Sequence, residues 1–292
     1  MSRKSRLKAW LSLAVMWLVS SNAWALDQKD GVYQIGSADD LAAFAELVNG
    51  GETAIDAVLT ADIDYSANTQ LIHMVGTSEN PYEGTFDGQF HRITVAFFVN
   101  EVAGEGKYVE DAAIIRVANL KATIKNLIVD GTINTNQKYA AGICAYAGAY
   151  ITHCASYVDI VSTVNGDGTH GGIVGHTTDG VRIDNCLAAG SIKGNVTTNC
   201  GGIMGWADNK CSISNCLQIA DIALLSQDGS ATIARNGGNV ISYNNYYVSN
   251  YGDKDEKATQ VTADMLADGS VCYMLNGDQT VKAKIGKVFV YQ

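Results

Sequence analysis

Short apolar segments recur along this chain at an interval of thirty residues. Isoleucine occupies the same place in four successive units, at Ile143, Ile173, Ile203 and Ile233. Two further isoleucine series keep step with the first, at Ile124, Ile151, Ile183 and Ile213, and at Ile133, Ile160, Ile192 and Ile222. The lengths between these positions vary only in polar stretches such as 164–169. Fixed apolar positions with tolerant polar turns between them are typical of a repeat protein.

Each unit contains three apolar segments, and all are too short for the paired helices of a helical solenoid. Ile, Val and Thr dominate them, and no proline follows Pro81 to interrupt a strand ladder. Three short strands per coil would stack each segment on its copy in the next coil, about 4.8 Å away. Stacking hides the apolar face of every coil. We therefore predict an all-β fold, a right-handed parallel β-helix (solenoid) with an N-terminal α-helical cap.

Other positions find places in this coil. Asparagines at a shared bend are expected to adopt the left-handed conformation and to hydrogen-bond along the column, namely Asn126, Asn185 and Asn215, with His153 as an interruption. The glycines flanking Ile173 and Ile203 are expected to allow tight corners and positive φ. Three cysteines at equivalent positions are expected to be buried thiols, namely Cys154, Cys186 and Cys216. Cys200 with Cys211 is the pair to test first for a disulfide.

The ends of such a stack need covers, because they expose strand edges. At the front, Ser37 predicts a helix start, and Asn49 with two glycines predicts its end. The apolar positions of this helix recur at i, i+3, i+4 and i+7, at Leu41, Phe44, Ala45 and Val48. Residues 57–65 and 84–99 are predicted to be the first strands. At the far end we predict a helical turn at 262–266 and closing strands at 272–276 and 288–290.

The N-terminal segment has the features of a signal peptide. A basic head is followed by an apolar run from Ala9 to Val19, too short to span a bilayer comfortably, and by a small-x-small pattern ending at Ala25. Cleavage after Ala25 would leave a secreted or cell-surface protein. The predicted organisation is then a signal peptide at 1–25, a cap with the first coils at 26–118, regular repeats at 119–250, and a C-terminal cap or tail at 251–292.

The net charge of the chain reduces the range of expected binding partners. The chain has 20 basic and 30 acidic residues; losing residues 1–25 leaves 16 basic ones and a net charge of −14. This balance argues against nucleic acid and against anionic membrane surfaces, and we expect no membrane insertion after signal cleavage.

Residues 171–175 (GGIVG) and 201–205 (GGIMG) resemble the GLUG motif of exported and surface proteins of Bacteroidota. Residues 33–49 and 84–93 look like the start of those chains. The resemblance implies a parallel β-helix and an adhesin-like surface protein. The motif also accompanies IgA-cleaving metalloendopeptidases, but their zinc-binding His-Glu-x-x-His pattern is absent from this sequence, so peptidase activity is not expected to carry over. Ala141 with Ala145, and residues 232–235, depart from the motif by losing its glycines.

The sequence shows no catalytic motif, and we expect no catalytic residues, cofactor or metal. Asp179 and Asp208 precede comparable coil starts and would neighbour one another in a hydrolase cleft, although turn positions explain both. Other weak candidates have simpler structural explanations: Asp62 with Asp64 as a cation site, Arg182 beside Asp184 as a lyase pair or a surface ion pair, and His170 with His176 as metal ligands.

Aromatic side chains are the better indication of binding. Tyr146, His176 and Trp206 fall at equivalent corners of three coils, so they predict a flat column on which sugar rings could stack. A second group comprises Tyr243, Tyr246 and Tyr247, with Tyr251 nearby; these rings could instead cover the last coil. We therefore expect an exported or cell-surface β-helix binding protein, adhesin-like, that contacts glycans or host proteins without catalysis. The alternative is a carbohydrate-active enzyme, a polysaccharide lyase or a glycoside hydrolase, on the same scaffold.

Overall fold

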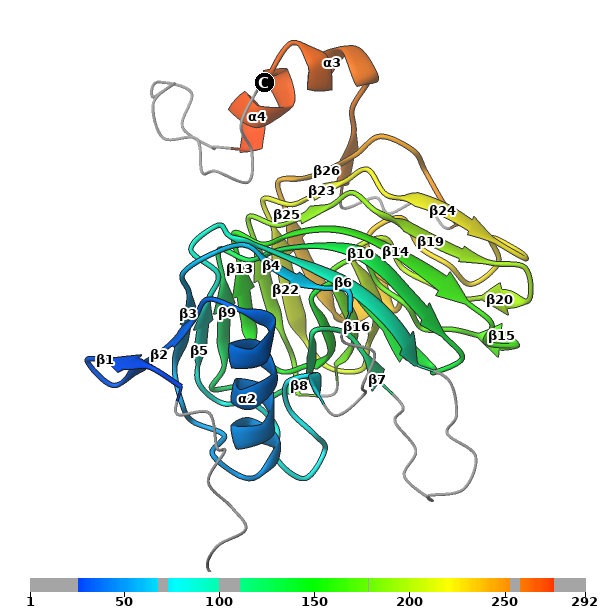
Figure 1. Ribbon diagram of the computed structural model, residues 1–292. Coiled ribbons are helices and arrows are strands. Elements are labelled where there is room, and N and C mark those ends of the chain that lie inside the picture. The colour runs from blue at the N-terminus through cyan, green and yellow to red at the C-terminus, as the bar shows by residue number, and fades with distance from the viewer. Residues whose placement is uncertain (1–25, 68–72, 100–110, 178, 253–257, 276–292) are drawn as a thin grey trace, which may run out of the picture.

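The computed structural model describes residues 26–67, 73–99, 111–177, 179–252 and 258–275. It is a parallel β-solenoid of about six turns, which confirms the predicted all-β fold (Figure 1). The predicted signal peptide at 1–25 and the predicted strand at 288–290 lie outside the described residues. Within the described ranges, no helix has the length and apolar character that crossing a membrane requires.

Three parallel sheets form the sides of the solenoid. Sheet 1 contains, in spatial order, β1 (Gln28–Lys29), β2 (Val32–Ile35), β3 (Ala57–Leu59), β5 (Thr85–Asp87), β9 (Thr123–Lys125), β13 (Tyr150–Thr152), β17 (Arg182–Asp184), β22 (Cys211–Ser214) and β25 (Val240–Tyr243), with only the β1–β2 pair antiparallel. Sheet 3 contains β8 (Ile115–Ala118), β12 (Cys144–Ala147), β16 (Val174–Thr177) and β21 (Met204–Ala207).

Sheet 2 is the largest of the three. It contains β4 (Ile63–Tyr65), β6 (Arg92–Val99), β10 (Ile128–Thr135), β14 (Ala155–Ser162), β18 (Leu187–Ala188), β23 (Leu217–Gln218), β26 (Asn245–Tyr247) and β27 (Ala258–Gln260), and β14 also pairs with β19 (Ser191–Gly194), which pairs with β24 (Asp221–Leu224). Two small pairs complete the coils: β7 (Asp111–Ala112) with β11 (Tyr139–Ala140), and β15 (Gly166–Asp167) with β20 (Thr197–Thr198).

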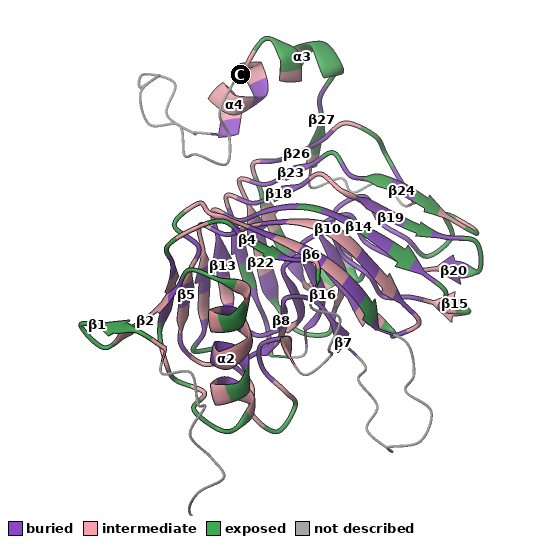
Figure 2. Ribbon diagram, viewed as in Figure 1, coloured by how far each residue is buried: buried purple, intermediate pink, exposed green. Residues whose placement is uncertain are grey.

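The three isoleucine series are in register across the coils, as their spacing predicts. Ile151 is paired with Ile124 and Ile183 in sheet 1, and Ile160 with Ile133 and Ile192 in sheet 2. At the third position the amide of Ile173 donates to the carbonyl of Ile203 at 3.0 Å, and the neighbouring coils repeat this bond. Most of these side chains are fully buried, so each coil contributes isoleucine to one continuous core. Figure 2 shows buried segments along the stacked strands.

The predicted asparagine bend is confirmed. The backbone is left-handed at every member of the column, with φ of 53° at Asn126, 54° at His153, 52° at Asn185 and 54° at Asn215, and Asn244 extends the column at 53°. The Asn244 side-chain amide donates to the Asn215 side-chain oxygen at 2.8 Å. Asn215 itself donates to Asp184, so the hydrogen bonds along this column use a carboxylate as well as amides.

The glycines of the repeat have a different role from the one predicted. Those flanking Ile173 and Ile203 do not adopt positive φ. Neighbouring backbone lies too close for a side chain instead: a Cβ on Gly171 would lie 1.9 Å from the Val174 carbonyl oxygen, and one on Gly202 would lie 2.0 Å from that of Thr232. These positions therefore require glycine for close packing of the backbone.

The predicted N-terminal cap is helix α2 (Ala38–Asn49), which packs over the first coils (Figure 1). The Ser37 hydroxyl accepts a hydrogen bond from the Asp40 amide at 3.2 Å, as a capping residue does. All four predicted apolar positions are fully buried. Phe44 makes edge-on contacts with Tyr82 and Phe86, each at 5.9 Å between ring centres, so the helix closes the first end of the core.

The C-terminal prediction is half right. Helix α3 (Ala263–Ala267) is capped by Thr262, which confirms the predicted helical turn, but the stretch predicted as a closing strand at 272–276 lies largely in helix α4 (Ser270–Leu275). Val271 and Leu275, four residues apart, face the same side and are buried. They pack in a cluster with an apolar row on sheet 2, formed by Ala155, Leu187, Leu217 and Tyr246. This row accounts for the helix, because it offers one apolar face. A short 3-10 helix, η2 (Gly237–Asn239), precedes β25.

The cysteines carry no disulfide. All seven are free thiols, and the predicted burial of Cys154, Cys186 and Cys216 is confirmed. The candidate disulfide between Cys200 and Cys211 does not form. The Cys200 thiol donates to the Thr198 carbonyl, whereas the Cys211 thiol lies 4.0 Å from the Met204 sulfur. Both thiols fill the core as small apolar side chains.

Candidate functional site

The corner residues singled out from the sequence lie on adjacent strands of sheet 3. In the strand register Tyr146 of β12 is paired with His176 of β16, and His176 is paired with Trp206 of β21. Tyr146 and Trp206 are half-buried, whereas His176 is 7% exposed. The predicted column therefore exists, and its two ends are open to solvent.

The column is not a flat platform. The Tyr146 ring meets the His176 ring edge-on, with 5.2 Å between centres and an interplanar angle of 71°. Tyr139 of β11, which the sequence analysis did not single out, stacks on His176 with 4.6 Å between centres and an angle of 10°. We call these four residues, Tyr139, Tyr146, His176 and Trp206, the aromatic cluster. It presents rings in two orientations rather than one continuous face.

Asp208 connects two members of the aromatic cluster. One carboxylate oxygen accepts a hydrogen bond from the Trp206 indole nitrogen, and the other lies 3.0 Å from His176 Nε2. The hydrogen bond from Trp206, with that from His176, lowers the pKa of Asp208 below its ordinary value. The ionised carboxylate therefore fixes the orientation of both rings.

Arg235 supports Trp206 from the next coil. Its guanidinium carbon lies 4.8 Å from the centre of the Trp206 ring, and its Nη1 donates to Asp167 at 3.0 Å and to the Asn199 carbonyl at 2.6 Å. Burial acts to raise the pKa of Asp167, but the Thr169 hydrogen bond and the Arg235 charge outweigh it and lower the pKa. Arg235 was missed from the sequence. The sequence contained one indication of its role. Ala234 is paired with Met204, so Arg235 occupies the position that Gly205 has one coil earlier.

The second predicted aromatic group divides in the structure. Tyr243 is 72% exposed at the end of β25, whereas Tyr246 and Tyr247 are 9% and 8% exposed. Tyr246 belongs to the apolar row under the C-terminal helices, and Tyr247 packs against the main core, as Tyr251 does. These rings cover the last coil, which leaves Tyr243 as the member of the group that a ligand meets directly.

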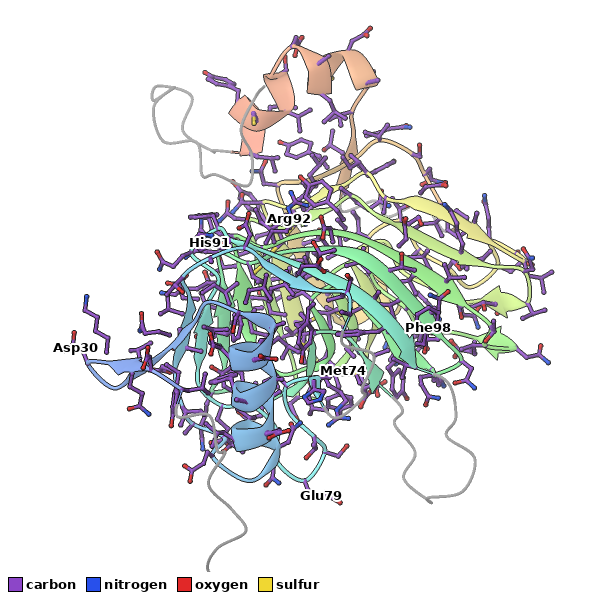
Figure 3. All side chains as sticks on the ribbon, in the orientation of Figure 1. Asp30, Met74, Glu79, His91, Arg92 and Phe98 are labelled. Carbon is purple, nitrogen blue, oxygen red and sulfur yellow. The ribbon has the colours of Figure 1, made fainter. Side chains whose placement is uncertain are left out.

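The acidic candidates do not gather in one groove. Asp208 contacts the aromatic cluster, whereas Asp179 lines a separate hollow on sheet 1. Asp62 accepts a hydrogen bond from the Arg92 amide and lies 3.1 Å from His91 Nδ1. Figure 3 labels His91 and Arg92, at the start of β6. Asp64 accepts a hydrogen bond from the Ser66 amide. Over the described ranges, no group of three His, Cys, Asp or Glu side chains could hold a metal ion.

The two remaining candidate pairs do not form in the structure. Arg182 does not pair with Asp184: its guanidinium carbon lies 4.5 Å from the centre of the Tyr150 ring, and Asp184 binds Ser214, Asn185 and Asn215. Arg182 and Asp184 lie on the same face of the strand, about 6.6 Å apart along it, whereas Tyr150 is the ladder partner of Arg182 on the neighbouring strand, about 4.8 Å away. His170 is fully buried and its Nε2 lies 2.7 Å from the Ser162 hydroxyl, which is a structural role.

Comparison with known proteins supports the fold. No family model matches the chain, and no curated protein matches it. Among solved structures, the chain is similar to a protein of Bacteroides ovatus described as a "putative immunoglobulin A1 protease". The TM-score is 0.61 at 19% sequence identity, and the match covers 88% of this chain and 92% of that one. At this identity the likeness shows a shared fold over most of both chains.

Proposed function

We propose that this protein is an exported, adhesin-like β-helix protein that binds glycans or host proteins through the aromatic cluster, without catalysis. The observation that carries the proposal is the register of Tyr146, His176 and Trp206 on three adjacent strands. A solenoid places such side chains on a rigid surface, so little conformational entropy is lost when a ligand binds them. The predicted signal peptide and the acidic composition support export and a partner other than nucleic acid.

The carboxylate beside the aromatic cluster suits a hydroxyl-rich ligand. Asp208 is ionised and half-exposed, with 46% of its side-chain surface accessible, so it retains capacity to accept hydrogen bonds beside Trp206. Aromatic faces with neighbouring carboxylates can hold a sugar ring by its apolar face and its hydroxyls together. The similarity to the Bacteroides ovatus protein adds no residue to this site, because the two chains share only 19% identity.

A double substitution tests the aromatic cluster. On a glycan array, Trp206→Ala with Tyr146→Ala is expected to lower binding at least about tenfold, as loss of aromatic anchors does at other interfaces. Tyr157→Ala is the matched control, because Tyr157 is also an exposed aromatic residue, 41% accessible, but lies on sheet 2. Unchanged binding by the double variant would contradict the proposal, as would an equal loss in the control.

A polysaccharide lyase or glycoside hydrolase is the second candidate. The observation that favours it is the 3.0 Å contact between His176 and Asp208, a pair of a kind used in general acid–base catalysis. Incubation with pectin, alginate or glycosaminoglycans and chromatography of the products separates the two proposals. We expect no product. Product release that Asp208→Asn abolishes would replace the binding proposal with the enzymatic one.

A further inference from the structure

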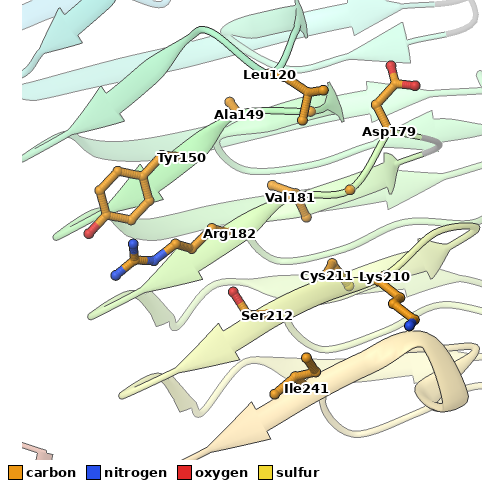
Figure 4. A pocket seen from close by; sticks show the side chains of 12 residues that line it. Leu120, Ala149, Tyr150, Asp179, Val181, Arg182, Lys210, Cys211, Ser212 and Ile241 are labelled. Carbon is orange, nitrogen blue, oxygen red and sulfur yellow. The ribbon is translucent and has the colours of Figure 1, made fainter.

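A shallow hollow of about 400 Å³ lies on the outer face of sheet 1, apart from the aromatic cluster. Its floor follows the outward row of that sheet, where Tyr150, Arg182, Ser212 and Ile241 are paired from strand to strand. Figure 4 shows Tyr150 and Arg182 side by side, and Asp179 and Lys210 on the opposite side of the hollow. Ser212 leaves space because its side chain is much smaller than its neighbours in the row.

The hollow contains two cations without a carboxylate partner. Six of the described lysines and arginines have a carboxylate oxygen within 4.0 Å, namely Arg92, Lys121, Lys125, Lys138, Lys193 and Arg235. Arg182 and Lys210 are exposed and have none among the described residues, although Asp179 lines the same hollow. In a chain with ten more acidic than basic residues, two unneutralised cations beside one hollow favour an anionic ligand.

The conformation of the Arg182 side chain is restricted before any ligand binds. Its guanidinium lies over the Tyr150 ring, with 4.5 Å from the guanidinium carbon to the ring centre. This contact leaves the guanidinium N–H groups, which have no hydrogen-bond partner among the described residues, free to donate to a carboxylate. Because the aromatic contact already restricts this side chain, less rotamer freedom is lost on binding.

The groups around Arg182 and Lys210 favour some classes of anionic ligand over others. The strands beneath them, β13, β17 and β22, are each paired on both sides, so their backbone offers no free edge to an extended peptide. The Asp179 carboxylate would repel a densely sulfated chain but would accept hydrogen bonds from hydroxyl groups. Leu120 and Ile241, which are 65% and 67% exposed, supply apolar surface at the two ends.

We infer that this hollow binds a carboxylated saccharide, such as a uronic acid unit of an acidic glycan. Arg182 and Lys210, on opposite sides of the hollow, bind the carboxylates of neighbouring uronic acid units, Asp179 and Ser212 bind hydroxyls, and Ile241 contacts the apolar face of a ring. The site is independent of the aromatic cluster, since the two share no residue.

Calorimetric titration with trigalacturonate tests this inference. We expect binding by the wild-type protein, and a loss of about tenfold or more in Arg182→Gln and in Lys210→Gln, because each removes a charge-assisted hydrogen bond. Fully methyl-esterified trigalacturonate lacks the carboxylates and is expected not to bind. Lys193→Gln is the matched control, because Lys193 is an exposed lysine on sheet 2 that does not line the hollow. Circular dichroism of each variant verifies that it is folded.

Several results would overturn the inference: no binding by the wild-type protein, equal binding of the methyl ester, or equal losses in Lys193→Gln. Tighter binding of triglutamate than of trigalacturonate would assign the hollow to acidic peptides and would also overturn it. Trp206→Ala is expected to leave trigalacturonate binding unchanged. Failure at the hollow and failure at the aromatic cluster are therefore distinguishable.

Discussion

Gly131→Ala is expected to lower the free energy of unfolding by about 3 kcal/mol or more, which combines the cost of a left-handed non-glycine residue with that of overpacking. Gly131 lies within β10 with φ of 100°, and an added Cβ would lie 2.0 Å from the carbonyl oxygen of Val95 on the neighbouring strand. Neither the conformation nor the contact can relax without moving the ladder. Urea denaturation followed by circular dichroism measures the loss.

Substitutions at two other glycines separate the cost of the left-handed backbone from the cost of overpacking. Gly166 also has positive φ, 92°, but has no atom within 4 Å of an added Cβ, so Gly166→Ala is expected to cost only about 1 kcal/mol. Gly238 has neither feature, and Gly238→Ala should stay within about 0.5 kcal/mol of the wild-type protein. If Gly131→Ala were no more destabilising than Gly166→Ala, close backbone packing would not be the reason for glycine in these coils.

Acidification from pH 7.5 to pH 4.5 is expected to remove about 2.5 kcal/mol of stability through His170 alone, at 1.36 kcal/mol for each unit of pH below its ordinary pKa. Burial lowers the pKa of His170 from 6.5 to about 3, with partial compensation by the Asp167 charge. The unfolded chain therefore binds a proton below pH 6.5 that the folded protein refuses until about pH 3. Stability falls across this window as the pH decreases.

His170→Gln isolates this effect. Glutamine retains a donor for the Ser162 hydroxyl, which lies 2.7 Å from His170 Nε2, and it does not titrate. Urea denaturation at both pH values should show a loss between them that is about 2.5 kcal/mol smaller in the variant. Asp167 contributes little here, because its unfolded-state pKa of 3.8 lies below the window. The same acid loss in both proteins would contradict the prediction.

The architecture could be predicted because it repeats. Each isoleucine series supplied several independent copies of one spacing, and the strand register that follows from them is confirmed. The cap was predictable for a local reason: Ser37 and four apolar positions at helical spacing determine α2 without distant contacts. The helix at 270–275 was not, because the same apolar residues suit a strand and only the apolar row on sheet 2 decides between the two.

The chemistry of the surface was less predictable. The spacing placed Tyr146, His176 and Trp206 together, but ring orientation depends on Tyr139 and Asp208, which come from outside the repeated positions. Arg182 turned to Tyr150 rather than to Asp184 because a ladder neighbour lies closer to it than a sequence neighbour does. The hollow exists because Ser212 interrupts a row of larger side chains. This interruption can be recognised only when the strand register is known, because the residues of the row are about thirty positions apart in the sequence.

The thirty-residue ladder also sets how this molecule can change in length over evolution. Ile143, Ile173 and Ile203 make the same contacts with the coil before and the coil after, so duplication or deletion of a whole coil would recreate each interface. A deletion within a polar turn is absorbed by that turn, whereas a deletion within a strand would shift that strand's register with its neighbours. Large differences in length between descendants of such a gene should therefore be multiples of about thirty residues, and each added coil would extend the outer surface by one strand spacing, about 4.8 Å.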